Sequence, residues 1–432
     1  MKLPFEKKGY TFITDDTNSI ESDTLFLKTV QNTPYFEKLE AKPEYIDATE
    51  LIRLWELDSM KVVGVTGTNG KTTVTAAAYS FLLDLGEKPA LQGTRGLFAQ
   101  EQRLEEKSMT TPSILETLHN MKQTRELGCE YFIMEVSSHA IDQKRIEGLN
   151  FVLKVHTNVT SDHLDYHGTV EEYRRVKSLF FADDTMKLLN KDDIKSISYN
   201  PRNAYSYGVD EPATYKVQAF SLLQGITAGI KYLQEEASFH SPMVGLFNLY
   251  NLMAAVGSVH LLTKRPIQEI CDVVENFAGV AGRMEVVSTD PLVIVDFAHT
   301  ADGMHQVLDS IKDRDISVVF GAGGNRDKEK RPRMGMVAGR FAKKIYVTSD
   351  NPRDEVPEMI LEDILVGLVG KEHVTATPDR RLAIKMALDD LEEGEVLLIL
   401  GKGDEDYQEI KGVKHPFDDR EVVRELLAQN KG

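Results

Sequence analysis

The chain has 432 residues, 41 % of them hydrophobic and 28 % charged, which excludes long disordered tracts and fibrous repeats. A formal charge of −17 argues against a broad nucleic-acid-binding surface, and the two cysteines, Cys129 and Cys271, match neither a disulfide framework nor a zinc site. Because no signal peptide or membrane-spanning run is recognisable, we expect a cytoplasmic monomer that binds neither nucleic acid nor membrane.

Three regions follow one another along the chain. Residues 1–58 are rich in loop residues and lack an alternation of strands and helices, whereas the rest shows short β-branched runs, most of them followed by a turn and a helical pattern. The predicted strands are 61–66, 131–136, 151–157, 292–297, 316–321, 344–349 and 395–401. This order is typical of parallel α/β sheets, whose ligands bind beyond the carboxyl ends of the strands. We place domain boundaries so that the domains are 1–58, 59–284 and 285–432.

A phosphate-binding loop follows the first of these strands. It reads Gly67-Thr68-Asn69-Gly70-Lys71-Thr72-Thr73 and leads into an Ala-rich helical segment. Glycines allow main-chain N–H groups to surround phosphate oxygens, Lys71 can reach the terminal phosphates, and a threonine hydroxyl can bind Mg²⁺. Val65 stands where the common pattern has a glycine, so this is a shortened form. The alternative is a Gly-rich turn that merely opens a helix.

Two further strands are followed by candidate metal ligands. Glu135 and His163 each follow a buried strand, which would bring them to the sheet edge of Lys71 as ligands of Mg²⁺. An isolated Glu or His is more often a surface or capping residue. The sequence around His163 is nevertheless dense in polar groups, namely Asn158, Asp162, His163, Asp165 and His167.

The ordered motifs resemble those of the Mur ligases, and among them the synthetases that add the third residue of the peptidoglycan stem peptide. The motifs are GTNGKTT, MEVSSH, TNVTSDHLDYHG, YRRVKSLF, GLFNLYNLMAA, GRME, VDFAHT, GAGGNRDKEKRPRMG, SDNPRDE and GKGDEDYQ. The resemblance implies an α/β fold of three domains: a short N-terminal UDP-binding domain, a central P-loop ATPase domain and a C-terminal Rossmann-like domain. It implies ATP-driven amide formation through an acyl phosphate.

The resemblance also implies roles for single residues. For ATP and Mg²⁺ they are Gly67 to Thr73, Glu135, His163, Asn248 at the adenine, Arg283 at the phosphates and Asp296 at the ribose. For UDP-MurNAc-L-Ala-D-Glu they are Ser19, Thr110, Thr111, Ser137, Gln143 and Arg145. Taken alone, Asn248, Thr110 and Thr111 could equally be helix caps, and Arg145 and Arg283 surface charges. Lys177 could be a solvated lysine, but the matching lysine of the family is carbamylated by CO₂ and binds Mg²⁺, which requires a neutral amine.

The incoming amino acid is implied by the segment Asp350-Asn351-Pro352-Arg353, which in this family marks enzymes that add meso-diaminopimelate. A guanidinium at Arg353 can hold the extra carboxylate that distinguishes this amino acid from L-lysine. Further contacts with the incoming amino acid would come from Arg326, Asp350, Asn351, Gly401 and Glu405. The segment is also a turn, which accounts for Asn351 and Pro352 but not for Arg353.

Several positions depart from the family pattern, namely the short N-terminal region, Ala281 for a proline, Asn325 for an aspartate and Asp404 for a histidine. Two other functions stay open. One is a ligase that adds L-lysine, another stem-peptide residue or glutamate to folate. The other is a nucleotide-gated binding protein that has lost the ligase step, although Lys71, Glu135, His163 and Lys177 are all present.

Overall fold

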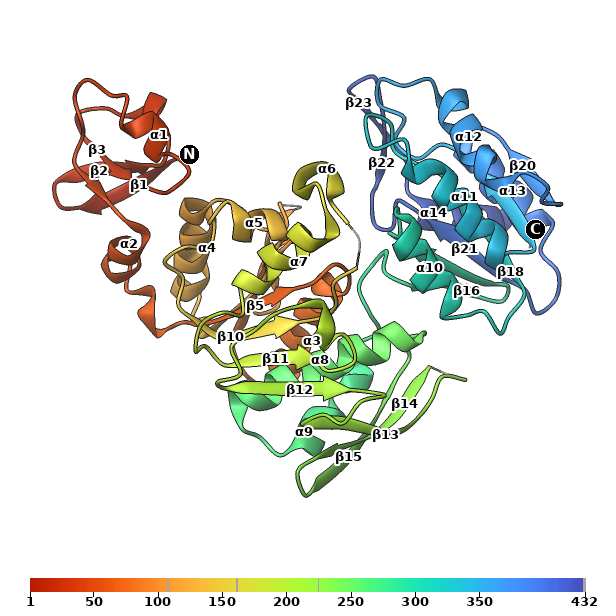
Figure 1. Cartoon of the computed structure of the whole chain (residues 1–432), viewed down its shortest axis with the longest axis horizontal. Helices are drawn as coiled ribbons and strands as arrows, with labels where there is room; N and C mark the ends of the chain where they lie inside the picture. Colours follow the sequence, from red (N-terminus) through yellow and green to blue (C-terminus); the bar gives the residue numbers. More distant parts are fainter. Residues whose placement is uncertain (107–108, 161, 224, 430–432) are drawn as a thin grey trace. The chain divides into compact units, whose positions relative to one another are not determined.

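The computed structural model describes residues 1–106, 109–160, 162–223 and 225–429 (Figure 1). The chain divides into two compact units. The first comprises Met1–Ser221, Thr227–Ser241 and Asn248–Phe277, and the second comprises Leu222–Ile226, Pro242–Phe247 and Ala278–Gly432. The predicted division of the first unit at residue 58 stays a prediction.

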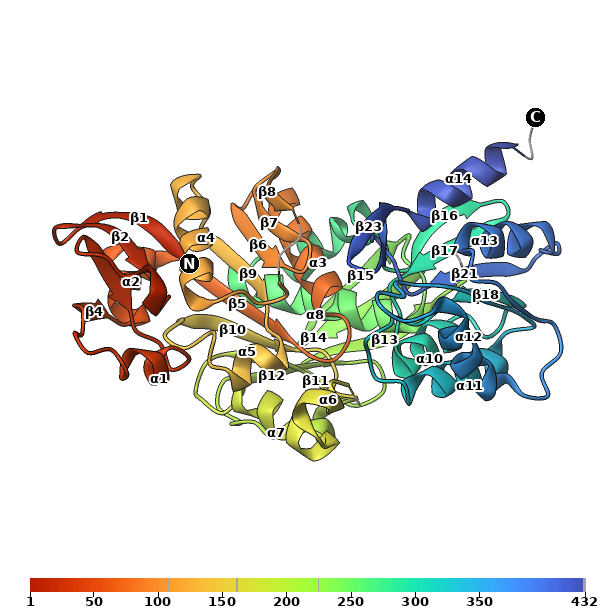
Figure 2. The same cartoon turned by 90° about the horizontal axis from the view of Figure 1, so that it is seen from above.

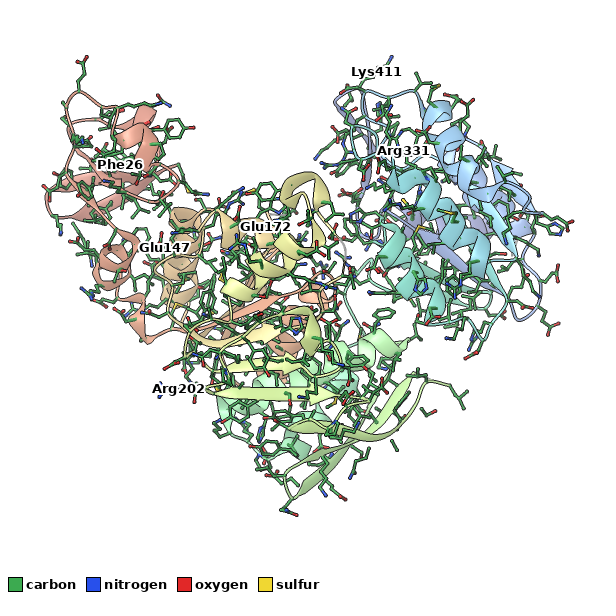
Figure 3. The ribbon with its side chains drawn as sticks, viewed as in Figure 1. Phe26, Glu147, Glu172, Arg202, Arg331 and Lys411 are labelled. Atoms are coloured by element: carbon green, nitrogen blue, oxygen red, sulfur yellow. The ribbon has the colours of Figure 1, made fainter. Side chains whose placement is uncertain are left out.

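The first 58 residues contain more regular structure than the sequence predicted. They form a four-stranded sheet in the order β1-β2-β3-β4, in which β1 is antiparallel and the others are parallel. Its elements are β1 (Lys2–Lys7), β2 (Tyr10–Thr14), η1 (Thr17–Ser19), β3 (Thr24–Leu27), α1 (Thr33–Phe36), β4 (Tyr45–Ile46), α2 (Ala48–Leu54) and η2 (Leu57–Ser59). Phe26 is fully buried and stacks on Phe36 at 5.3 Å between ring centres (Figure 3). Two of these strands, β3 with four residues and β4 with two, are too short to show a clear period in the sequence.

An eleven-stranded sheet forms the centre of the first unit, in the order β15-β14-β13-β12-β11-β10-β5-β9-β6-β7-β8. The seven strands from β13 to β6 in this order run parallel, and antiparallel hairpin strands extend both edges. The strands are β5 (Lys61–Thr66), β6 (Pro89–Gly93), β7 (Gly96–Ala99), β8 (Gln102–Glu106), β9 (Tyr131–Glu135), β10 (Phe151–His156), β11 (Lys187–Asn190), β12 (Ala204–Gly208), β13 (Tyr215–Ser221), β14 (Ile226–Tyr232) and β15 (Glu235–Ser241). The P-loop strand β5 therefore lies between two strands that lead to candidate ligands. These are β10, which precedes His163 in the chain, and β9, which ends at Glu135.

The helices of this unit are α3 (Lys71–Asp84), α4 (Ile114–Glu126), α5 (Ser138–Asp142), α6 (Leu164–His167), α7 (Val170–Leu179), η3 (Ile194–Ser196), α8 (Leu246–Thr263), α9 (Ile267–Asp272) and η4 (Val274–Asn276). Among the described residues, α8 alone is long and apolar enough to cross a membrane, and 72 % of its apolar window is buried inside the protein. A helix buried on all sides reads as apolar because it has no solvated face.

A second sheet of six strands forms the second unit, in the order β16-β17-β21-β18-β19-β20, and only the edge strand β16 is antiparallel. Figure 2 shows α10, α11 and α12 on one face and α13 and α14 on the other, and each face has its own apolar cluster. The elements are β16 (Glu285–Thr289), β17 (Leu292–Asp296), α10 (Ala301–Asp309), β18 (Ile316–Phe320), α11 (Lys330–Phe341), β19 (Lys344–Val347), α12 (Pro357–Leu365), η5 (Val366–Leu368), β20 (Val374–Ala376), α13 (Arg380–Asp389), β21 (Val396–Leu400), β22 (Tyr407–Ile410), β23 (Val413–Pro416) and α14 (Asp419–Gln429). The predicted α/β class and the predicted strands are confirmed, to within a residue or two at their ends.

Candidate functional site

The P-loop is a tight turn between β5 and α3. A Cβ atom on Gly67 would lie 1.8 Å from the Thr157 hydroxyl oxygen, and one on Gly70, whose φ is +86°, would lie 2.4 Å from the Asn251 amide oxygen. Only glycine fits both positions. The Lys71 ammonium donates to the carbonyl oxygens of Gly67 (2.8 Å) and Thr68 (2.9 Å), so it lies over the loop. This is the cradle expected for a phosphate chain.

The loop is held from β10 by Asn158. Its main-chain oxygen accepts from Thr68 N at 2.7 Å, and its side-chain oxygen accepts from Asn69 N at 3.0 Å. Asn158, one residue of the polar segment around His163, therefore shapes the P-loop.

Thr72 and Glu135 are brought together as the sequence predicted. The Thr72 hydroxyl donates to Glu135 Oε2 at 3.0 Å, and Thr94 N donates to Oε1 at 2.9 Å. Glu135 is buried, and a Cβ on Gly93 would lie 2.2 Å from its Oε1. A cavity of about 160 Å³ opens beside this pair, between α3 and the β6–β7 hairpin. In the part of the chain that the structure describes, no three His, Cys, Asp or Glu side chains converge as metal ligands. A Mg²⁺ ion here would therefore need further oxygen ligands, such as phosphate oxygens.

Within the described residues, His163 makes no hydrogen bond or ion pair with Glu135, although the charges of Lys71 and Lys177 act on it. Its side chain is about half exposed and pairs with Asp162 at 3.4 Å, and its ring lies 4.9 Å from that of His139. Partial burial lowers its pKa, so the imidazole is neutral at neutral pH, as a metal ligand must be. His167 is buried and contacts the Ser138 hydroxyl at 3.0 Å. A position of His163 beside the phosphates stays a prediction.

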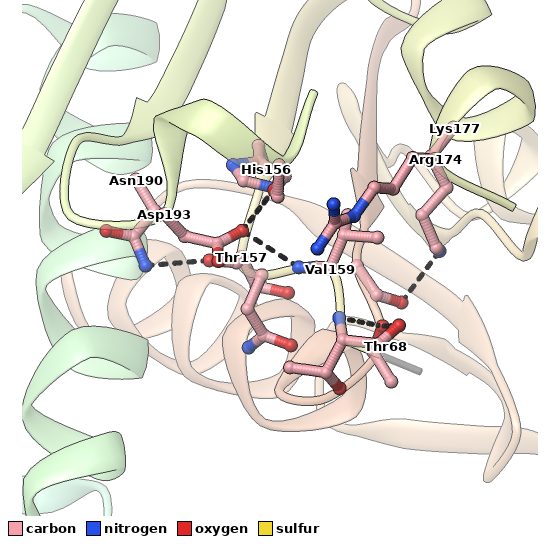
Figure 4. A network of polar contacts seen from close by, with 12 residues as sticks. Thr68, His156, Thr157, Val159, Arg174, Lys177, Asn190 and Asp193 are labelled. Carbon is pink, nitrogen blue, oxygen red and sulfur yellow. Dashed lines mark hydrogen bonds and ion pairs between the residues drawn. The ribbon is translucent and has the colours of Figure 1, made fainter. Parts of the chain in front are cut away.

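Lys177 lies inside the protein beneath the P-loop (Figure 4). It is 1 % exposed, and its ammonium donates to Gly67 O at 2.9 Å and contacts the Thr66 hydroxyl at 3.3 Å. Among the described residues it pairs with no carboxylate. Burial, and then the positive charge of Lys71, lower the pKa of Lys177 well below its usual value. The interpretation of Lys177 as a solvated lysine is therefore wrong, and its burial beside Lys71 favours the neutral amine that carbamylation requires.

A pair that the sequence did not indicate, the buried His156 and the partly exposed Asp193, supports the segment after β10. His156 is fully buried, its Nε2 lies 3.3 Å from Asp193 Oδ2, and the same carboxylate accepts from Val159 N at 2.8 Å (Figure 4). Burial lowers the pKa of His156, which keeps it uncharged. Asn190 donates to Thr157 O at 2.8 Å. These contacts fix residues 157–159 against the P-loop. In the sequence, the only sign of such a role is that residues 157–159 directly follow a strand.

Most of the residues predicted to hold the dipeptide substrate lie together around the end of β9. The Thr111 hydroxyl donates to Glu135 O (3.0 Å) and accepts from Ser137 N (2.9 Å). Arg145 donates to Gln143 Oε1 at 2.6 and 2.9 Å and to Thr111 O at 3.0 Å, so it is not a free surface charge. Thr110 contacts Thr94 at 3.1 Å. Ser113 is the cap of α4, so the interpretation of Thr110 and Thr111 as its caps is wrong.

Ser19 lies apart from this group, in η1, where its hydroxyl donates to Asp16 at 2.9 Å. Next to it is a hollow of about 310 Å³. Its lining residues are Asp15, Asp16, Thr17, Asn18, Thr29, Gln31, Asn32 and Tyr35. The hollow has hydrogen-bonding groups and one aromatic ring but neither Lys nor Arg, so it suits a polar ring better than a phosphate.

The residues predicted to contact the nucleoside are divided between the two units. In the first, Asn248 is buried within α8 and accepts from Asn251 at 3.1 Å, so it is not a cap. In the second, the Arg283 guanidinium lies 4.4 Å from the ring centre of Phe297. Asp296 is buried and accepts from the main-chain N–H groups of Met284 and Ala298, each at 2.7 Å. Burial raises the pKa of Asp296, which Arg283 opposes.

In the second unit, a network of polar and charged side chains links residues that were predicted to bind the incoming amino acid. Asn351 donates to Glu405 Oε2 at 2.8 Å, and the fully buried Lys402 donates to the same oxygen (3.0 Å) and to Asn351 Oδ1 (3.2 Å). Gly401 has φ of +115°, and a Cβ there would lie 2.5 Å from Asp350 Oδ2. Sequence reasoning missed Lys402, although it lies within the GKG motif.

Arg353 lies at the edge of this network. Its Nη1 donates to Gly324 O at 2.8 Å and its Nε lies 3.3 Å from Glu409 Oε2. Arg326 is exposed in the loop after β18 and is not part of the network. The buried Arg331, labelled in Figure 3, pairs with Glu355 and Asp363 and so ties α11 to the segment that carries Arg353.

Asn325 explains one departure from the family pattern. Its amide donates to Asp354 Oδ2 at 2.6 Å, where an aspartate would face another carboxylate. The structure gives no comparable reason for Asp404.

Comparisons with known proteins cover the whole chain. The family model for the Mur ligase middle domain matches residues 65–259, and that for the Mur ligase, glutamate ligase domain matches residues 282–403. A protein of Wolinella succinogenes is 50 % identical over 434 residues and 100 % of both chains, and one of Helicobacter hepaticus is 48 % identical over 99 % of this chain and 98 % of its own. Both are named UDP-N-acetylmuramoyl-L-alanyl-D-glutamate–2,6-diaminopimelate ligase.

Solved structures give the same result. A structure of a ligase of that name is 31 % identical with a TM-score of 0.68, over 97 % of this chain and 95 % of its own. A folylpolyglutamate synthase of Mycobacterium tuberculosis has a TM-score of 0.65 at 15 % identity, over 82 % of this chain and 91 % of its own, which shows a shared fold alone.

Proposed function

Because the chain belongs to the Mur ligase family, we propose that it is an ATP-dependent ligase that adds meso-diaminopimelate to UDP-MurNAc-L-Ala-D-Glu in the synthesis of peptidoglycan precursors. The observation that carries this proposal is the P-loop, where the Lys71 ammonium and the buried Lys177 amine both donate to Gly67 O and Thr72 donates to Glu135. Such a site binds and polarises a triphosphate.

The reaction follows from the charges of the reactants. The terminal carboxylate of the dipeptide attacks the γ-phosphorus of ATP, the bond to the β–γ bridging oxygen breaks, and ADP leaves. The amine of the amino acid then attacks the acyl carbon, loses a proton and expels phosphate, which leaves a new amide. Lys71 stabilises the negative charge on the phosphoryl oxygens in the first step. No protein nucleophile is required.

Thr72, Glu135, His163 and a modified Lys177 are the residues that we propose to hold Mg²⁺, which when bound supplies positive charge to the phosphates. The Thr72–Glu135 pair supports this assignment, because it presents a hydroxyl and a carboxylate beside the loop. The lowered pKa of Lys177 supports its carbamylation, since CO₂ reacts with a neutral amine. The carbamate would convert a buried cation into an anionic oxygen ligand.

The dipeptide substrate would lie along the first unit. We assign its peptide part to Thr110, Thr111, Ser137, Gln143 and Arg145. Hydrogen bonds join the last four of these residues to one another, and Thr110 contacts Thr94, which binds Glu135. The hollow beside Ser19 is where we place the uracil. Asp15 and Asp16 can accept from the imide N–H, and Tyr35 offers a ring to stack on.

The amino acid would bind in the second unit. We assign it to Arg326, Asp350, Asn351, Arg353, Gly401 and Glu405. Arg353 favours meso-diaminopimelate over L-lysine because it offers a guanidinium to a second carboxylate.

The decisive test is the release of phosphate by the purified protein with ATP, Mg²⁺, UDP-MurNAc-L-Ala-D-Glu and one amino acid at a time. Release that requires both the dipeptide and meso-diaminopimelate supports the proposal. Release with L-lysine alone would favour the sister ligase, and nucleotide binding with no release would favour the binding protein.

A further inference from the structure

A buried ion pair lies behind the amino-acid network of the second unit. Arg380 and Asp419 have fully buried side chains, and Nε and Nη2 of the guanidinium each donate to one carboxylate oxygen at 2.7 Å. Arg380 is the first residue of α13 and Asp419 the first of α14. The pair therefore joins two helices at the edge of the sheet where the strands end.

The same guanidinium also binds the ends of two strands. Nη1 donates to Ser349 O at 3.2 Å, and Nη2 donates to Leu400 O at 3.0 Å. Ser349 directly precedes Asp350 and Asn351, and Leu400, the last residue of β21, directly precedes Gly401. Since β18 lies between β19 and β21 in the sheet, Arg380 spans the gap between two segments that no direct strand pairing joins.

The spacing that Arg380 sets is critical at the next residue of each segment. A Cβ on Gly401 would lie 2.5 Å from Asp350 Oδ2, so the two segments touch there. Asp350 is 8 % exposed, and within the described residues its Oδ2 has no hydrogen-bond donor. A buried carboxylate oxygen without a donor is costly unless a ligand supplies one. Arg380 thus holds the residue before Asp350 on one segment and the residue before Gly401 on the other, and these two residues meet at the oxygen that has no donor.

We propose that Arg380, held by Asp419, is the positioning residue of the amino-acid site: it fixes the distance between the Asp350-Asn351 segment and Gly401 so that their polar groups meet the incoming amino acid. This inference rests on the proposed function. Arg380 does not touch the substrate. Its charge interacts through space with those of Asp350 and Glu405. Two of its hydrogen bonds hold the main chain at Ser349 and Leu400, and two hold Asp419.

Lys344 and Glu395 provide a matched control. They form a largely buried ion pair (3.0 Å) at the opposite ends of the same strands, because Lys344 begins β19 and Glu395 immediately precedes β21. Loss of either pair is expected to lower stability. Only loss of the Arg380 pair is expected to change the geometry at Asp350 and Gly401.

The test compares Michaelis constants of the full-length enzyme for its three substrates. The variants are Asp419→Asn, which keeps the shape of the pair, the double replacement Arg380→Met with Asp419→Leu, which keeps an apolar core, and the control Lys344→Met with Glu395→Leu. We expect the first two to raise the KM for meso-diaminopimelate on the order of 10- to 100-fold, because a small misplacement of binding groups costs this much. Their KM for ATP and for the dipeptide should change by less than about threefold.

Each outcome has one meaning. An equal rise in all three KM values, or a rise for meso-diaminopimelate in the control as well, would show that the pair acts through stability alone and overturn the inference. An unchanged KM for meso-diaminopimelate in folded Asp419→Asn, or in the folded Arg380→Met with Asp419→Leu variant, would do the same, and thermal unfolding identifies which variants are folded. A wild-type enzyme with no turnover of meso-diaminopimelate would instead refute the proposed function.

Discussion

The phosphate site of the first unit and the amino-acid site of the second differ in how they hold their charges. Beneath the P-loop, Lys177 is buried against main-chain oxygens and pairs with no described carboxylate. In the second unit, Lys402 pairs with Glu405, Arg353 with Glu409 and Arg380 with Asp419. The difference fits the proposed roles. A lysine that is buried without a carboxylate can stay neutral and react with CO₂, whereas a zwitterionic amino acid with equal numbers of ammonium and carboxylate groups requires a balanced site of fixed geometry.

The largest expected effect is on the phosphate site. Lys71→Ala should lower phosphate release on the order of 10²–10³-fold, because the ammonium stabilises charge that develops in the transition state. The half-exposed position of Lys71 at the start of α3 leaves the core intact, so the melting temperature should change little. Single-turnover phosphate release measures the effect. A folded variant with nearly normal turnover would show that this loop does not activate ATP.

The next effect concerns specificity in the second unit. Wild-type enzyme should prefer meso-diaminopimelate over L-lysine by roughly 10⁴–10⁵ in kcat/KM, because L-lysine leaves the guanidinium without its carboxylate. Arg353→Ala should lose about 1.5–3 kcal/mol of that preference. Glu409→Gln offers a matched control, since it removes the partner of Arg353 but leaves the guanidinium in place. Equal use of both amino acids by the wild type would refute the specificity and leave the ligase reaction standing.

A smaller effect is expected at the hollow beside Ser19. Base stacking on an aromatic side chain is worth about 1–3 kcal/mol, so Tyr35→Ala should raise the KM for UDP-MurNAc-L-Ala-D-Glu by roughly 5- to 150-fold with kcat unchanged. Tyr35 is 63 % exposed, and its loss should not unfold the protein. Tyr199→Ala, an exposed tyrosine outside the hollow, serves as the control. If both variants keep the wild-type KM, the uracil binds elsewhere.

The smallest effect is a pH dependence of stability at Lys177. Its pKa is lowered in the folded protein and is about 10.5 in the unfolded chain, so between these values the unfolded chain binds more protons. The wild type should therefore gain stability relative to Lys177→Met as the pH rises through this window. Urea unfolding at several pH values, without CO₂ and nucleotide, measures the difference. A difference that does not vary with pH would mean that Lys177 titrates normally.

The sequence predicted the P-loop and the Thr72–Glu135 pair because strand, loop and helix are adjacent in the chain, and the parallel strands β5 and β9 bring their ends together. It did not predict the sheet of residues 1–58, whose strands are as short as two residues. Nor did it indicate His156, Lys402 or Arg380, because a charged residue within a helix or after a strand reads as solvated until its burial and its distant partner are known. Asp193 lies 37 positions after its partner His156, and Asp419 lies 39 positions after its partner Arg380.

The central claim is that the first unit activates a carboxylate and the second selects the amine that captures it. The most direct measurement is mass spectrometry of the product formed by purified protein from UDP-MurNAc-L-Ala-D-Glu, ATP and Mg²⁺, with meso-diaminopimelate and L-lysine supplied together in equal amounts. The account predicts a product extended by diaminopimelate, with almost none extended by lysine, and no product without ATP. A mixture of both products would contradict the selection by the second unit, and the absence of any amide product would contradict the ligase reaction itself.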